Sequence, residues 1–254
     1  TYDEAYFEDP GQREDVPEAV RGHYAPGELK ADFPFFDNHV SGGVRPPLVE
    51  GHDASGVIAS TLGHHSKPYT RIELHLEDGV VTDIEGGGER GDRLRDLLER
   101  TRDVQYPDFP GPGLFWWFEC AIGTNPKVFR PSRFMRKSEP GTLVERLRSG
   151  IVHLGTGTSA TIYSEEWAND QAIPYGHVDH HLNFPTYEIH TGSEVVTVIE
   201  KGHLVALDDP EVRAVAERFG DPDELLSVDW VPPLPGVNTD GDYETYARDP
   251  AAYL

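Results

Sequence analysis

Alternation of apolar and polar residues along the middle of the chain predicts a protein built mainly from β-strands. The clearest case is residues 70–85, where two such runs flank Asp78-Gly79, a pair typical of a tight hairpin turn. The same patterning, or short apolar runs, predicts further strands over residues 56–61, 114–122, 151–154, 177–183, 187–190, 194–200 and 203–207.

Three short helices are expected among these strands. The glycines at 86–88 end the hairpin, and Asp92 is placed to cap a helix that runs to about Arg102. A second helix is expected over 142–148, and a third over 210–219, after Asp209. The predicted fold class is therefore α+β: a mainly antiparallel or mixed β domain with a few short helices and irregular ends.

The two ends of the chain lack this patterning. Residues 1–50 combine charge, proline and scattered aromatic side chains without a period, which predicts an irregular N-terminal arm. Residues 51–225, which hold the expected strands, are predicted to form one domain, the part of the chain in which candidate chemistry is to be sought. Residues 226–254, rich in proline, aspartate and tyrosine, are expected to lie along its surface as a tail.

Composition narrows the classes of function. The 254 residues include 45 acidic and 22 basic ones, and the net charge of -23 excludes nucleic acid as a partner. Two explanations of this excess of acidic residues stay open: adaptation to high salt, or an ordinary acidic protein from a GC-rich genome.

A single cysteine, Cys120, excludes internal disulfides and multi-cysteine metal sites. No membrane-length apolar run or leader is present, so we expect a cytoplasmic location without membrane contact.

Any metal must then be held by His, Asp and Glu, and His177-Val-Asp179 is the first candidate. On a strand these two side chains point to the same side. An ordinary surface pair gives the same pattern, so further ligands are needed. Glu119 is one, because it is the lone charge in an apolar run; a structural ion pair with an arginine is the alternative. His153, which runs into a glycine-rich loop, is the other.

Four segments carry a family resemblance through their order and spacing: Glu119–Pro126, Gly150–Gly155, His177–Asp179 and the hairpin at 194–207. Together with the expected strands at 56–61 and 72–86, they resemble the catalytic domain of the aminopeptidase T (leucyl aminopeptidase, thermophilic metalloprotease) family over about residues 40 to 207. The resemblance implies this fold, a dimer, and metal ligands at Glu119, His153, His177 and Asp179, with the glutamate bridging two ions.

One departure from that family bears on the number of metal ions. The family has a further glutamate ahead of residue 56, whereas residues 39–47 hold no acidic residue and Glu50 is displaced. A branch of the superfamily, similar to 2,5-dihydroxypyridine 5,6-dioxygenase, holds one iron(II) and opens an aromatic ring with oxygen. Loss of the second-metal glutamate favours this branch, because two-metal hydrolysis needs both ions.

The leading hypothesis is a mononuclear non-haem iron(II) oxygenase acting on a small hydroxylated aromatic or heteroaromatic compound. Glu119, His177 and Asp179 would hold the iron, with His153 as a fourth ligand or as a donor to one. His180 and Tyr163 are candidate acid–base residues.

Two alternatives stay open. One is a metal-dependent aminopeptidase or hydrolase using zinc or cobalt, and the other is a non-catalytic assembly or binding module. Both enzyme relatives carry an N-terminal domain that helps to close the site, whereas only the irregular residues 1–50 precede the match here. We therefore expect a homo-oligomer, or a partner chain, to cover the site.

Overall fold

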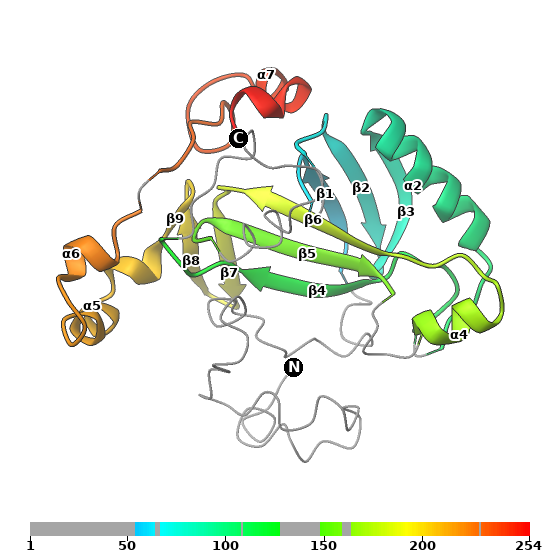
Figure 1. Cartoon of the computed structure of the whole chain (residues 1–254), viewed down its shortest axis with the longest axis horizontal. Coiled ribbons are helices and arrows are strands. Elements are labelled where there is room, and N and C mark those ends of the chain that lie inside the picture. Colours follow the sequence, from blue (N-terminus) through cyan, green and yellow to red (C-terminus); the bar gives the residue numbers. More distant parts are fainter. Residues whose placement is uncertain (1–53, 64–66, 108, 128–147, 159–163, 229) are drawn as a thin grey trace, which may run out of the picture.

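The computed structural model describes residues 54–63, 67–107, 109–127, 148–158, 164–228 and 230–254. Within them the chain forms three antiparallel sheets of three strands each, with a few short helices (Figure 1). The predicted α+β class is confirmed. The predicted N-terminal arm and the predicted helix at 142–148 fall almost wholly outside the described residues.

The first sheet has the order β1-β2-β3, formed by Gly56–Ser60, Ile72–Glu77 and Val80–Gly86. The predicted hairpin between β2 and β3 is confirmed. Asp78 and Gly79 have φ values of 50° and 82°, as a turn with two left-handed residues requires.

Helix α2 (Gly88–Thr101) begins earlier than predicted, after Gly87 rather than after Asp92. The glycines that end β3 also start the helix. Gly87 is left-handed with a φ of 74°, and a Cβ on Gly91 would lie 1.9 Å from the Gly86 carbonyl oxygen. Only residues without side chains allow so close a junction of strand and helix.

The second sheet, β4-β5-β6, consists of Trp117–Ile122, Ile151–Gly157 and His177–Asn183. Backbone pairing links it to the first sheet at both edges. At one edge the His181 amide donates to the Leu62 carbonyl at 2.9 Å, and at the other the Trp117 amide donates to the Gly79 carbonyl at 2.9 Å. The strands of the two sheets run across one another in Figure 1.

Both sheets contribute to one buried hydrophobic cluster. Leu94, Leu97 and Leu98 of α2 pack against it. Its buried members include Ile58, Ile72, Leu74, Leu76, Val81, Ile84, Leu114, Phe115, Phe118 and Val178. The second sheet therefore rests on a packed layer, which holds its three strands in fixed register.

The third sheet combines β7 (Tyr187–Thr191), β8 (Glu194–Glu200) and β9 (His203–Leu204). The predicted strand at 203–207 is wrong beyond Leu204, because a 3-10 helix, η5 (Val205–Asp208), follows. Its three-residue period brings Leu204 and Leu207 into one buried cluster, whereas an extended strand of alternating side chains keeps the same spacing on opposite faces.

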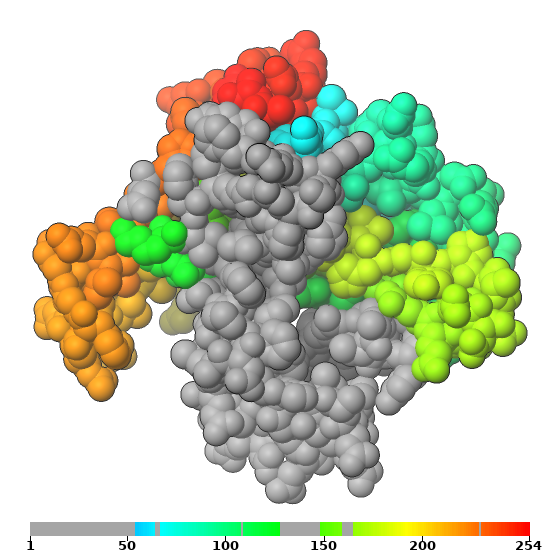
Figure 2. Space-filling model, in the orientation of Figure 1, coloured from blue at the N-terminus to red at the C-terminus, as the bar shows by residue number. Residues whose placement is uncertain are grey.

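Two short helices follow η5 and project at one side of the molecule (orange in Figure 2). Helix α5 (Pro210–Ala216) has the predicted cap, since the Asp209 carboxylate accepts hydrogen bonds from two amides of its first turn. It ends at Ala216, before the predicted Phe219. Helix α6 (Pro222–Leu225) comes next.

The C-terminal stretch 226–254 includes α7 (Tyr243–Arg248) and the 3-10 helix η6 (Pro250–Ala252). Leu234, Tyr246 and Leu254 are buried against Ile151 and Phe184 of the second sheet's region. The Tyr246 hydroxyl also lies 2.6 Å from Thr61 Oγ1. The tail therefore packs against the sheets through its own hydrophobic cluster.

Helix α4 (Ser164–Asp170) lies between β5 and β6 in the chain. None of the helices among the described residues is long and apolar enough to cross a membrane.

Replacing Leu74, which is fully buried in the shared cluster, tests whether that cluster holds the sheets together. We expect Leu74→Ala to lower the free energy of unfolding by roughly 2–5 kcal/mol in urea denaturation, because it leaves a cavity. The control Val57→Ala, at a position 55% exposed, should change it by less than about 0.5 kcal/mol. Equal effects of the two variants would contradict a shared core.

Candidate metal centre

The register of the second sheet brings the predicted ligands onto one face. Glu119 on β4 pairs with Gly155 on β5, and Gly155 pairs with Asp179 on β6, so the three residues form a row across the strands. His153 and His177 each lie two residues from this row along their strands. Residues paired across strands, and residues two apart within a strand, share a face.

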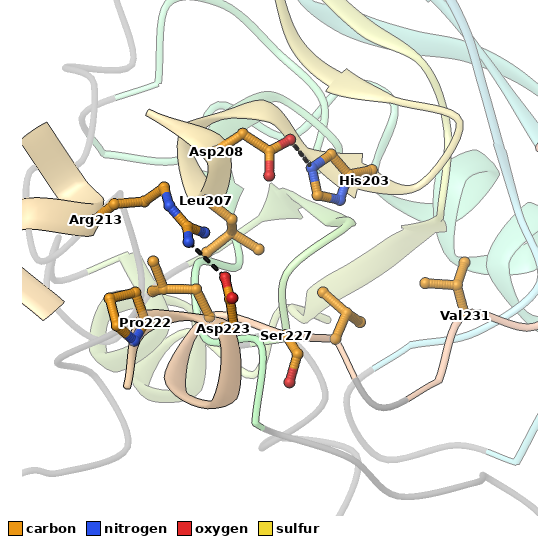
Figure 3. A pocket seen from close by; sticks show the side chains of 10 residues that line it. His203, Leu207, Asp208, Arg213, Pro222, Asp223, Ser227 and Val231 are labelled. Atoms are coloured by element: carbon orange, nitrogen blue, oxygen red, sulfur yellow. Dashed lines mark hydrogen bonds and ion pairs between the residues drawn. The ribbon is translucent and has the colours of Figure 1, made fainter. Parts of the chain in front are cut away.

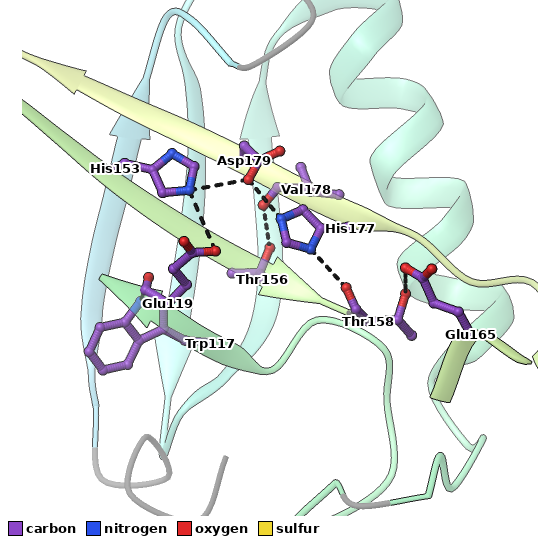
Figure 4. Close-up of polar contacts among 9 residues, drawn as sticks. All are labelled: Trp117, Glu119, His153, Thr156, Thr158, Glu165, His177, Val178 and Asp179. Carbon is purple, nitrogen blue, oxygen red and sulfur yellow. Dashed lines mark hydrogen bonds and ion pairs between the residues drawn. The ribbon is translucent and has the colours of Figure 1, made fainter. Parts of the chain in front are cut away.

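The side chains of Glu119, His153, His177 and Asp179 point toward one another (Figure 4). His153 Nε2 lies 3.3 Å from Asp179 Oδ1 and 3.6 Å from Glu119 Oε2. One donor atom from each of these three residues lies within 4.8 Å of the other two, a spacing that suits a single metal ion. His177 Nε2 adjoins this triad, 2.8 Å from Asp179 Oδ1. All four predicted ligands therefore come together, and their role as ligands stays a prediction.

The absence of a side chain at Gly155 allows the Glu119 side chain to reach His153 and Asp179. Glu119 lies on β4 and Asp179 on β6. These two outer strands are roughly 9.5 Å apart, so one of the two side chains must extend across β5. A Cβ on Gly155 would lie 3.0 Å from Glu119 Cβ, 3.1 Å from Glu119 Oε2 and 3.3 Å from Phe118 Cζ. Glu119 thus occupies the space that a side chain at position 155 would take.

The triad is shielded from water. The His153 side chain is fully buried, and those of Glu119 and Asp179 are 8% and 10% exposed. Burial acts to lower the pKa of His153, but its interactions with Asp179 and Glu119 outweigh burial and raise the pKa above its usual value. Two carboxylates in so dry a place favour a positive charge between them, which a proton or a metal cation supplies.

His177 lies at the accessible side of the cluster, with 27% of its side chain exposed. Its Nδ1 is 2.9 Å from the Thr158 carbonyl oxygen, which can only accept, so Nδ1 carries a hydrogen and Nε2 faces Asp179. Phe118 packs edge-on against the ring at 5.1 Å. The Thr158 hydroxyl in turn donates to Glu165 at the start of α4. The orientation of the imidazole is thereby fixed for Nε2 coordination.

Of the two candidate acid–base residues, His180 is not brought to this cluster. His180 faces the other side of the sheet, where it is fully buried and its Nδ1 is hydrogen-bonded to the Ser60 hydroxyl at 3.2 Å. Burial and the nearby Arg90 lower the pKa of His180 to about 3, so its ring is neutral. This position lends no support to an acid–base role. Tyr163 lies outside the described residues.

Sequence reasoning missed His181. It is fully buried on the same face as Asp179, it pairs with His153 across the strands, and the two imidazole rings pack edge-to-face at 5.3 Å. The sequence pattern could have identified it, because His177, Asp179 and His181 follow one another at two-residue intervals and so share a face of the strand. His181 therefore packs beside the triad, against His153.

The donor chemistry fits a divalent transition metal. Imidazole and carboxylate donors together suit iron, manganese and zinc, and two carboxylates balance a charge of +2. A second group with suitable spacing, Glu73, His75 and Glu85, lies on the first sheet, but its members are half-buried or exposed. Among the described residues, the triad of Glu119, His153 and Asp179 is the buried candidate.

Comparison with known proteins adds little to this geometry. No protein-family model matches the chain, and no curated protein matches it. One solved structure with partial similarity is the 2,5-dihydroxypyridine dioxygenase of Pseudomonas putida KT2440, with 19% identity and a TM-score of 0.42 over 61% of this chain. The chain spans 41% of that protein's length. A similarity of this extent establishes neither a common fold nor a common activity, and membership of the aminopeptidase T family stays a prediction.

Gly155→Ala tests the geometry directly. The added methyl group should displace the Glu119 carboxylate and weaken binding of Mn²⁺ or Co²⁺ roughly 10- to 100-fold, the range seen when the surroundings of ligands are disturbed. Titration calorimetry measures the affinity, and circular dichroism checks the fold.

Gly176→Ala is the matched control, because its Cβ would meet only Leu97 Cδ2, at an ordinary 3.7 Å. Unchanged metal affinity in Gly155→Ala would show that Glu119 is not a ligand.

Proposed function

We propose that this chain is a metal-dependent enzyme with one divalent ion, and that it acts as a non-haem iron(II) oxygenase on a small hydroxylated aromatic or heteroaromatic compound. The observation that carries the proposal is the buried triad of Glu119, His153 and Asp179, with His177 beside it. The donors come from one face of one sheet, so, as far as the described residues go, an ion held by them would have room for other ligands on the side away from the sheet.

Glu119, His153, His177 and Asp179 would hold the iron(II), and the iron would supply the chemistry with oxygen. The protein's own part is to bind, orient and shield. His153 and the two carboxylates form the buried base of the site, and His181 packs against His153 on the side away from His177. His177, the most exposed of the four, marks the side from which a substrate approaches. Phe118 offers a ring edge beside it.

A hydrolase with zinc or cobalt is the second candidate, and one observation favours it. With Glu119 in place the set contains two carboxylates and two imidazoles, which is richer in carboxylate than a two-histidine, one-carboxylate iron site. The displaced Glu50 and residues 39–47, on which the choice between one and two ions depends, lie outside the described residues. The number of bound ions therefore separates the two functions.

Anaerobic purification followed by elemental analysis tests the proposal. We expect one iron per chain, and we expect Asp179→Asn and Glu119→Gln to lose it. Metal at 100 times its dissociation constant should stabilise the wild-type chain by about 2.7 kcal/mol, and the two variants far less. His203→Asn, which alters an exposed histidine that pairs with Asp208, is the control that should keep its metal.

Oxygen consumption then separates the functions. An electrode assay with catechol, hydroquinone and 2,5-dihydroxypyridine should show uptake that depends on Asp179 and on iron. Two zinc ions per chain, with hydrolysis of leucine p-nitroanilide in the absence of oxygen, would replace the oxygenase by the hydrolase. A chain that binds no metal would leave the non-catalytic module.

A further inference from the structure

We propose that a cavity between η5, α5 and α6 binds a small amphipathic ammonium compound. The cavity has a volume of about 420 Å³, within the roughly 300–1,000 Å³ usual for small-molecule sites. It is built from residues 203–231, and none of the four candidate metal ligands lines it. This inference does not depend on the proposed function.

Half of the residues that line the cavity are apolar. Leu207 is buried and belongs to the hydrophobic cluster of the third sheet, and its side chain reaches the centre of the cavity in Figure 3. The apolar lining consists of Leu207, Pro222, Leu226, Val228 and Val231. Such a surface favours a ligand with a hydrocarbon or aromatic body, since covering it removes apolar area from water.

The other half of the lining is polar, and the positive and negative charges of its side chains do not cancel. Asp223 is paired with the guanidinium group of Arg213 at 2.5 Å, so a permanent cation neutralises it. Asp208 is paired at 2.7 Å with His203, whose imidazole is a cation only when protonated. The lining therefore holds two carboxylates, Asp208 and Asp223, and one permanent cation, Arg213, which leaves the Asp208 end the more negative.

A further cation, Lys127, donates to the Ser227 hydroxyl at 2.7 Å. Ser227 lies across the cavity from Asp208 in Figure 3, so the positive and negative ends are separated. An ammonium group therefore fits best at Asp208, with the body of the ligand over Leu207 and Leu226. The chain's net charge of -23 further disfavours an anionic ligand.

Three indole compounds with the same ring and two-carbon arm test the charge preference: tryptamine, tryptophol and indole-3-propionate. Each is titrated into the ¹⁵N-labelled protein, and amide shifts are followed by NMR. We expect shifts centred on residues 203–231, with tryptamine binding roughly two- to five-fold tighter than the neutral tryptophol, as for an exposed ion pair. Indole-3-propionate should bind most weakly.

Asp208→Asn should bring tryptamine to the affinity of tryptophol and leave tryptophol unchanged. Glu224→Gln removes the same charge from an exposed side chain of α6 that does not line the cavity, so it should keep the preference. The proposal is overturned if none of the three compounds shifts residues 203–231, if tryptamine has no advantage over tryptophol, or if Asp208→Asn keeps that advantage.

Discussion

Two carboxylates buried side by side, with a histidine between them, are the constraint on which the candidate site depends. Glu119 and Asp179 are each about nine-tenths buried, and such a pair is stable only if a positive charge lies between them. In the structure the His153 imidazole occupies that position. Burial lowers its pKa, but the two carboxylates raise it above the usual value, so they favour a cation there. A divalent metal bound by the same atoms satisfies both carboxylates at once. The electrostatics of the site therefore favour a bound cation, and the metal ion and its oxygenase chemistry are our proposal.

The rest of the fold keeps these groups in place. The second sheet is paired to the first at both edges and rests on the shared hydrophobic cluster, so β4, β5 and β6 cannot slide relative to one another without breaking both. A slip of one residue would turn Asp179 to the opposite face, toward the first sheet. His180 marks that face, since it is held by Ser60 of β1. Contacts on the face of the second sheet that packs against the first sheet thus fix the register that brings the candidate ligands together.

Much of the site was predictable, because it follows a local period. His177 and Asp179 are two residues apart on a strand, and Glu119 is a lone charge in an apolar run, so sequence alone could select them. The part played by Gly155 could not be foreseen, since it depends on which residues pair across three strands. The same limit explains the errors elsewhere. The early start of α2 depends on Gly91 packing against the Gly86 carbonyl, and η5 depends on burying Leu204 together with Leu207.

The most direct test of the central claim is a crystal structure of the chain grown with Mn²⁺, with the ion located by its anomalous scattering. The account predicts one strong peak within about 2.3 Å of donor atoms from Glu119, His153 and Asp179, with His177 Nε2 at or next to the coordination sphere. A peak only at the more exposed group of Glu73, His75 and Glu85, or no peak at the triad, would contradict it.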